Sequence, residues 1–174
     1  MRNIGYFLLF SILLNGCDVF SDEKLTLQRT DYNGNELRMD GYYYKYDTSY
    51  DSSVPNRTIC YFFFRNGISV AMGSYETIDL KTVEREMLER YKWLYKHKSV
   101  WGVFVINGNT FEEEGWSTSV GGGLPVARCI GIIENDTTIH ITKHFEKNKE
   151  YARNYRWHFK QFSPKPDSTN NFIK

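Results

Sequence analysis

Short runs in which large side chains alternate, separated by turn-forming residues, constrain the fold of this chain more than any other feature. Because successive side chains of a strand point to opposite faces, a period of two predicts β-strands. Aromatic residues make up 17% of the chain and fall mainly within these runs, which favours β-structure over disorder. We expect strands at residues 41–46, 58–65, 68–75, 100–106, 110–119, 127–133, 137–145 and 155–162.

Residues 79–98 depart from this alternation. Their apolar side chains recur every three or four residues and charged side chains fill the other positions, which predicts an amphipathic helix with Thr77 or Asp79 as its N-cap. This helix falls between the third and fourth expected strands. Its apolar positions are Val83, Met87, Leu88, Tyr91, Leu94 and Tyr95.

Tight turns join most of the expected strands. Asn66-Gly67 is a favoured two-residue hairpin turn, because both residue types tolerate a positive φ. Short connections imply antiparallel neighbours, and such a meander either curls into a barrel or packs its open face on a helix. The sequence therefore predicts a mainly β (α+β) fold. We expect an antiparallel up-and-down meander of about eight strands, forming an open or closed barrel, with one amphipathic helix packed on it.

The first sixteen residues have the features of a secretory signal. Arg2 supplies a positive charge, residues 4–14 are largely apolar, and the small residue Gly16 ends the run. The run is too short for a membrane-spanning helix, which needs roughly 20 apolar residues. The expected organisation is a signal peptide (1–16), a flexible tether (17–36), a single β-rich domain (37–163) and a C-terminal tail (164–174).

The charge balance limits the classes of partner. The whole chain has 22 Lys and Arg against 21 Asp and Glu, and removal of the signal with Arg2 brings the formal charge to zero. Nucleic-acid-binding domains usually carry a basic field. We therefore expect no nucleic-acid partner.

The end of the signal, Leu14-Asn15-Gly16-Cys17, resembles the lipobox of bacterial lipoproteins. The resemblance implies cleavage before Cys17 and attachment of palmitate and other acyl chains to that cysteine. It implies a cell-envelope protein held to a membrane by lipid, with the outer membrane favoured over the inner. Whether the domain faces the periplasm or the cell surface stays open.

Several turn sequences resemble those of small lipocalin-like lipoproteins of Bacteroidota. They are the repeated strand–Asn-Gly–strand units, Trp101-Gly102 at the start of a strand, Asn135-Asp136-Thr137-Thr138, and the segment 165–169. The resemblance implies a lipocalin-like barrel, although a helix within the strand series differs from the usual lipocalin order. Asp136-Thr137-Thr138 and Asp167-Ser168-Thr169 also resemble the O-glycosylation sequence of Bacteroidota envelope proteins, which implies Thr137 and Ser168 as glycan sites.

Two further cysteines, Cys60 and Cys129, lie in expected strands. In an oxidising compartment they could form one disulfide, or they could be two buried small hydrophobic residues. Counting cysteines does not decide between these alternatives.

Residue patterns typical of catalysis or metal binding are weak. Four strand residues separate His140 and His144 by about 13 Å, too far to share one metal ion, so we expect surface or edge histidines. Glu112, Glu113 and Glu114 are expected to form a solvated edge that discourages sheet aggregation. We expect no metal, no cofactor and no enzymatic activity.

The aromatic strands give the best indication of function. Rings on strand faces could line a cavity for a small apolar ligand, or could form an ordinary core. The sequence thus predicts a membrane-anchored, non-enzymatic envelope lipoprotein that binds a small apolar ligand or another envelope component. The alternative is a structural or accessory subunit of an envelope or surface complex. The candidate ligand-facing residues are Tyr42, Tyr44, Tyr61, Phe63, Trp101 and Trp157.

Overall fold

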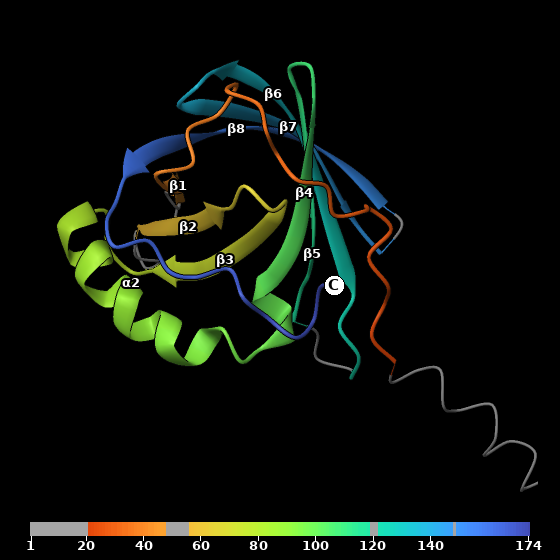
Figure 1. Ribbon diagram of the computed structural model, residues 1–174, viewed down its shortest axis with the longest axis horizontal. Helices are drawn as coiled ribbons and strands as arrows, with labels where there is room; N and C mark the ends of the chain where they lie inside the picture. The colour runs from red at the N-terminus through yellow and green to blue at the C-terminus, as the bar shows by residue number, and fades with distance from the viewer. Residues whose placement is uncertain (1–20, 48–55, 119–121, 148) are drawn as a thin grey trace, which may run out of the picture.

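Eight antiparallel strands close into one barrel (Figure 1). The structure is a computed structural model that describes residues 21–47, 56–118, 122–147 and 149–174, so the signal and Cys17 lie outside the described residues. Each strand pairs with its neighbours in chain order, and β1 pairs with β8, which confirms the predicted meander and shows that the barrel is closed. The strands are β1 Gly41–Asp47, β2 Arg57–Phe63, β3 Ile68–Tyr75, β4 Trp101–Asn107, β5 Thr110–Trp116, β6 Val126–Asn135, β7 Thr138–Glu146 and β8 Lys149–Gln161.

The helix α2, Leu80–Leu94, lies between β3 and β4, as predicted. Asp79 is its N-cap: the carboxylate accepts hydrogen bonds from the backbone N–H groups of Lys81 and Thr82. A short 3-10 helix, η2 (Lys98–Val100), then leads into β4. The architecture is compatible with a lipocalin-like fold.

Strand β8 is longer than the sequence pattern suggests. It begins at Lys149, whereas the sequence predicts the last strand over residues 155–162 only. Most side chains in the first half of the strand are exposed, so no apolar alternation marks it. Backbone pairing with β7 holds it instead, from Glu146↔Lys149 to Thr138↔His158.

Two hydrophobic clusters lie on the two sides of the barrel wall. The outer cluster lies between the outward faces of β1–β3 and the buried side of α2, and it includes Tyr42, Cys60, Phe62, Met72, Val83, Met87 and Trp101. The inner cluster fills part of the barrel and includes Tyr43, Phe63, Phe104, Phe111, Cys129, Ile139, Ile141 and Trp157. A residue of β1–β3 that points outward therefore packs on the side of α2, and one that points inward packs in the barrel interior.

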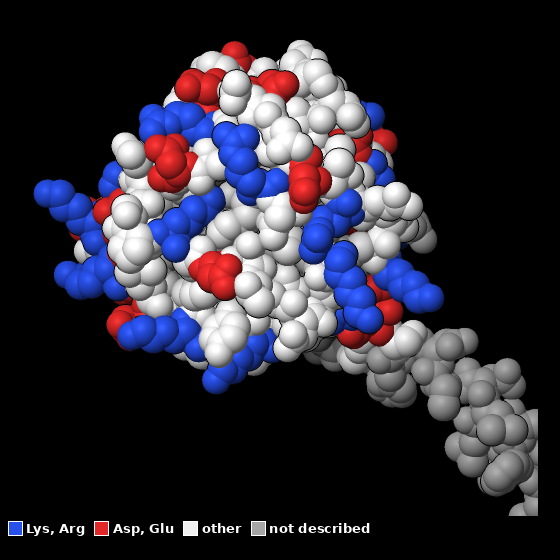
Figure 2. Space-filling model, in the orientation of Figure 1, with Lys and Arg blue, Asp and Glu red and all other residues white. Residues whose placement is uncertain are grey.

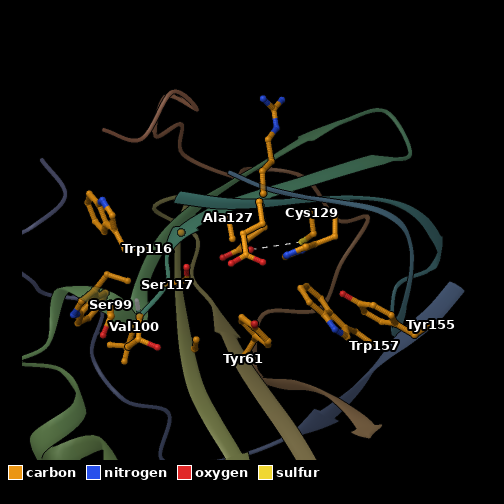
Figure 3. A pocket seen from close by; sticks show the side chains of 17 residues that line it. Tyr61, Ser99, Val100, Trp116, Ser117, Ala127, Cys129, Tyr155 and Trp157 are labelled. Atoms are coloured by element: carbon orange, nitrogen blue, oxygen red, sulfur yellow. Dashed lines mark hydrogen bonds between the residues drawn. The ribbon is translucent and has the colours of Figure 1, made fainter. Parts of the chain in front are cut away.

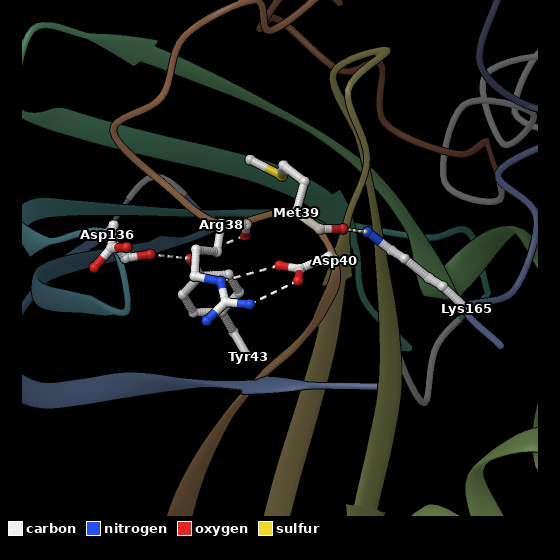
Figure 4. A network of polar contacts seen from close by, with 6 residues as sticks. All are labelled: Arg38, Met39, Asp40, Tyr43, Asp136 and Lys165. Carbon is white, nitrogen blue, oxygen red and sulfur yellow. Dashed lines mark hydrogen bonds and ion pairs between the residues drawn. The ribbon is translucent and has the colours of Figure 1, made fainter. Parts of the chain in front are cut away.

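One end of the barrel is closed by residues 32–40, which cross it. The backbone N–H of Arg38 donates to the carbonyl of Asp136 in the β6–β7 turn, and the Tyr43 hydroxyl lies 3.2 and 3.1 Å from the carbonyls of Arg38 and Asp136 (Figure 4). The Lys165 ammonium donates to the carbonyl of Met39 from the other side. Burial lowers the pKa of Lys165 to about 8. Side chains and carbonyls from distant parts of the chain therefore seal this end.

The segment before the barrel is not a flexible tether over the residues described. Glu114 of β5 accepts hydrogen bonds from the backbone N–H groups of Thr26 and Leu27, at 2.5 and 2.7 Å, and from the Thr26 hydroxyl. Further along, Tyr32 and Leu37 are buried, with 7% and 1% of their surface exposed. Residues 21–36 thus form part of the folded domain, because a buried carboxylate needs the donors that this segment supplies.

The C-terminal tail also lies on the barrel. Phe172 and Ile173 pack against the outer cluster, and the Tyr91 hydroxyl of α2 donates to the carbonyl of Asp167. The tail thereby covers apolar surface next to α2, where it runs between the helix and the strands (Figure 1).

Two features of the β2–β3 turn require a glycine at position 67: a positive φ and a close approach of the N-terminal segment. Gly67 has a φ of 75°, whereas Asn66 does not take a positive φ, so the turn is not the symmetrical two-residue type that we predicted. The N–H of Gly67 donates to the carbonyl of Phe64. A Cβ at position 67 would lie 2.3 Å from the carbonyl oxygen of Thr30, so the absent side chain also admits the N-terminal segment.

We predict that Gly67→Ala lowers the free energy of unfolding by more than the matched variant Gly108→Ala. Both glycines have positive φ, 75° and 61°, and the left-handed backbone costs an alanine about 1–2 kcal/mol. Only Gly67 has a close neighbour, since a Cβ at Gly108 would meet nothing within 4 Å. Urea unfolding of both variants measures the difference. Equal losses would mean that residue 30 does not lie against the turn.

Candidate functional site

A cavity of about 270 Å³ occupies the half of the barrel away from the sealed end. Tyr61, Tyr155 and Trp157 form one wall, as Figure 3 shows, and the ring centroids of Tyr61 and Trp157 lie 4.7 Å apart. The rim is formed where β4 begins and β5 ends, by Ser99, Val100, Ser117 and Thr118.

Small residues create this cavity. Ala71, Gly115 and Ala127 line it from β3, β5 and β6, whereas large rings from the inner cluster fill the other half of the barrel. Strands β3 and β4 also pair only from Ile68↔Val103 to Val70↔Trp101, so the wall is not hydrogen-bonded as far as the rim on this side. The cavity therefore results from small interior side chains and from incomplete pairing of β3 with β4, neither of which the alternation of the sequence predicts.

Glu113 places a carboxyl group in the cavity. Its oxygens accept hydrogen bonds from the Ser69 hydroxyl, at 2.9 Å, and from the Cys129 thiol, at 3.6 Å (Figure 3, dashed line for the thiol). Desolvation inside the barrel raises the pKa of Glu113 to about 7, and the two hydrogen bonds oppose that rise. The carboxyl therefore takes up a proton at a higher pH than an ordinary glutamate does.

Gly102 makes the position of this carboxyl possible. A Cβ at residue 102 would lie 2.6 Å from the Ser69 hydroxyl oxygen and 2.8 Å from Oε1 of Glu113. A glycine inside a strand often marks such a close approach.

His144 also lines the cavity, because a β-bulge changes the face on which it lies. The register between β6 and β7 shifts between Ile141 and Lys143, so Thr142 is inserted and Cys129 stands opposite His144. Burial, and then the positive charge of Arg153, lower the pKa of His144. Our expectation of a surface or edge histidine is therefore wrong for His144. His140 lies on the other side of the bulge and bonds to the Asn154 amide oxygen.

The predicted ligand-facing aromatics divide between the two faces of the wall. Tyr61 and Trp157 line the cavity, and Phe63 belongs to the filled part of the interior. Trp101 borders the cavity, but its side chain belongs to the outer cluster, where the indole N–H donates to the carbonyl of Tyr95, so the prediction is wrong for its ring. Tyr42 and Tyr44 do not face the interior, and the prediction is wrong for them. They pack in or against the outer cluster, where the Tyr42 hydroxyl bonds to Glu84 of α2.

The two strand cysteines are free and buried. Cys60 belongs to the outer cluster and Cys129 to the inner cluster, so the barrel wall separates their side chains. The structure thus has the second of the two alternatives, two buried small residues, and not a Cys60–Cys129 disulfide. Burial raises the pKa of both thiols, which disfavours the reactive thiolate.

The three consecutive glutamates do not form a solvated edge. Glu112 and Glu114 point outward, where Glu112 pairs with Arg128 and Glu114 holds residues 26–27, while Glu113 points into the barrel. Only 3% of the Glu114 surface is exposed. The sequence Glu112-Glu113-Glu114 does not indicate that the three carboxylates lie in three different environments.

No protein-family model, no curated protein and no solved structure matches this chain. The function therefore has to be argued from the side chains of the barrel itself.

The face of the molecule seen in Figure 2 carries no field of one sign. Figure 2 shows Lys and Arg side chains interspersed with Asp and Glu over the face in view, in keeping with their near-equal numbers. Within the described residues, no three His, Cys, Asp or Glu side chains gather as metal ligands, and no helix is long and apolar enough to cross a membrane.

The two predicted glycan acceptors lie in polar surroundings. The Thr137 hydroxyl donates to the Asn135 side chain at 2.8 Å in the β6–β7 turn, and the Ser168 hydroxyl accepts from the Asn66 amide at 3.0 Å. Both residues are only partly exposed. Glycosylation at either stays a prediction.

Glu113 and His144 are cavity residues that we did not predict from the sequence. Gly102 and Gly115, on the strands that flank and carry Glu113, are the available signal, because glycines within strands mark close approaches or missing side chains. No residue pattern in the sequence predicts the β-bulge that places His144 on the inner face of the barrel.

We predict that Glu113 makes the unfolding free energy fall as the pH rises from 5 to 8. Its pKa is higher in the folded state, so its contribution is complete below the ordinary value near 4.5 and is lost as the pH rises through about 7. The effect is at most about 3 kcal/mol, since each pH unit of difference is worth about 1.4 kcal/mol and cavity water screens part of it. The lowered pKa of His144 acts in the opposite direction, because that contribution is lost as the pH falls.

Glu113→Gln separates these two effects. Urea unfolding at pH 5 and pH 8 should show the variant gaining stability relative to the wild type at pH 8 only. A difference between variant and wild type that is the same at both pH values would contradict the raised pKa.

Proposed function

We propose that the chain is a lipid-anchored, non-enzymatic protein of the cell envelope whose barrel binds a small, largely apolar ligand. The cavity beside Tyr61, Tyr155 and Trp157 is the observation that carries this proposal. The lipobox-like sequence ending at Cys17 supports the lipid anchor, and we favour the outer membrane over the inner as its location.

The cavity volume limits the ligand to a small molecule. An apolar cavity of about 150 Å³ can hold benzene, and typical ligand sites start near 300 Å³. At about 270 Å³ the cavity suits a compact body of one or two rings or a short branched chain. Ring walls favour an apolar body, and the Glu113 carboxyl gives such a ligand one polar contact.

The anchor would hold the barrel close to the membrane. Asp22 forms an ion pair with Lys98 at 2.8 Å and accepts a hydrogen bond from the N–H of Leu124. Cys17 precedes Asp22 by five residues, which can span at most about 18 Å when extended. Lys98 directly precedes Ser99 and Val100 of the cavity rim, so the rim would lie on the membrane side of the barrel.

An accessory subunit of an envelope complex is the second candidate. Ile78, Trp93 and Tyr95, on and beside α2, have 52%, 54% and 40% of their surface exposed. Exposed large apolar side chains are typical of protein contact sites. A partner that binds this side would leave the cavity free, which distinguishes the two functions.

Native mass spectrometry of the full chain purified from membranes tests the anchor and the cavity together. We predict a polypeptide that begins at Cys17, carries acyl chains and retains a small molecule. Ala127→Leu, which adds bulk inside the cavity, should keep the acyl chains and lose the small molecule. The matched control Ala152→Leu lies on the exposed part of β8 and should keep both.

Each half of the proposal can fail separately in this experiment. A mass that begins at Met1 without acyl chains would refute the anchor. A small molecule retained equally by Ala127→Leu would refute the cavity as its site.

A further inference from the structure

Glu113 has no cationic partner within the described part of the chain. The two groups that donate to its carboxylate, the Ser69 hydroxyl and the Cys129 thiol, are both neutral. An ionised carboxylate removed from water is costly unless a positive charge compensates it. When Glu113 is ionised, the barrel therefore holds a negative charge that the described side chains do not compensate.

The remaining charged groups of the cavity do not supply that compensation. Arg128 forms an ion pair with Glu112 on the outer face of the wall, and Glu146 adds a second carboxylate to the cavity lining. The lowered pKa of His144 keeps its ring neutral at physiological pH. Lys45 is not one of the residues that line the cavity; its ammonium lies 4.1 Å from the centroid of the Tyr155 ring and does not act on the Glu113 carboxyl.

Aromatic rings stand beside the same carboxylate. Tyr61, Tyr155 and Trp157 line the cavity with Glu113 (Figure 3). The face of an aromatic ring attracts a cation, most strongly where water is excluded. A carboxylate within a partly aromatic wall offers a cationic nitrogen both an ion pair and ring faces, while the rings bury the apolar remainder of the molecule.

We propose that the cavity binds a small monocationic amine with an apolar body, whose ammonium group pairs with Glu113. This inference rests on the proposed function, because it assigns a ligand class to the same cavity. The amine supplies the positive charge that no described side chain provides, and its body occupies the space left by Ala71, Gly115 and Ala127.

The pH dependence of binding follows from the groups that face Glu113. These are Tyr61 from β2, Ser69 from β3, Cys129 from β6 and Tyr155 from β8, with Glu114 next to it on β5. Burial raises the pKa of Tyr61, Cys129 and Tyr155, so none of them loses a proton near neutral pH. Ionisation of Glu113 therefore dominates: between pH 5.5 and pH 8 its ionised fraction, and with it amine affinity, rises about 30-fold for a pKa of about 7.

Isothermal titration of the full chain in detergent with phenethylamine and with its neutral counterpart 2-phenylethanol tests the assignment. We expect the amine to bind more tightly than the alcohol at pH 8 and to weaken by more than tenfold at pH 5.5. Glu113→Gln should lose at least tenfold in amine affinity and most of the pH dependence. Any pH dependence left in the variant reports proton loss by His144.

Two controls separate the role of Glu113 from damage to the fold. Glu112→Gln changes the adjacent outward carboxylate and should leave amine affinity unchanged. Binding of 2-phenylethanol by Glu113→Gln should persist, which shows that the cavity is intact in the variant.

The remaining outcomes overturn the inference. If the alcohol or phenylacetate binds as tightly as the amine, or if Glu113→Gln does not weaken amine binding, the cavity still takes a ligand but the cationic class is wrong. If none of the three compounds binds, both the ligand class and the proposed function fail.

Discussion

Backbone hydrogen bonding between β1 and β8 closes the sheet into a barrel. The register from Gly41↔Gln161 to Tyr44↔His158 joins the two ends of the meander and gives every strand an inner and an outer face. Closure makes the inner face a separate compartment, sealed at one end by residues 32–40 and partly filled by rings. The helix α2 then packs against the outer face. Without closure, the distinction between a cavity and an ordinary core would not arise.

The regular parts of this arrangement were predictable from the sequence. Alternation located the strands, the spacing of Val83 and Met87 located α2, and its N-cap, Asp79, is one of the two residues predicted, because each is a local property of the chain. Alternation also placed Tyr61 and Phe63 together, but it could not say which face of a strand is the interior, and so Tyr42 was assigned wrongly. That decision depends on where α2 docks.

The missed features arise from interactions between distant segments. A β-bulge at Thr142 places His144 on the inner face of the barrel, and no residue type in the sequence predicts the position of that bulge. Three adjacent glutamates looked alike, yet Glu114 receives the N–H groups of residues 26–27 and Glu113 receives only a hydroxyl and a thiol. The described part of the expected tether, residues 21–36, is folded for the same reason, since Glu114 needs the donors of residues 26–27.

The account of function rests on one charge in a confined space. A carboxyl group that only neutral groups contact beside aromatic rings loses hydration energy when it ionises. Pairing with a positively charged ligand would offset that loss. The most direct test is a pH titration of the Glu113 side-chain carboxyl carbon by NMR. The account predicts a midpoint near 7, displaced downward when an amine is bound. An ordinary midpoint near 4.5 in the free protein would show that the carboxyl is solvated, and would contradict its place inside the barrel.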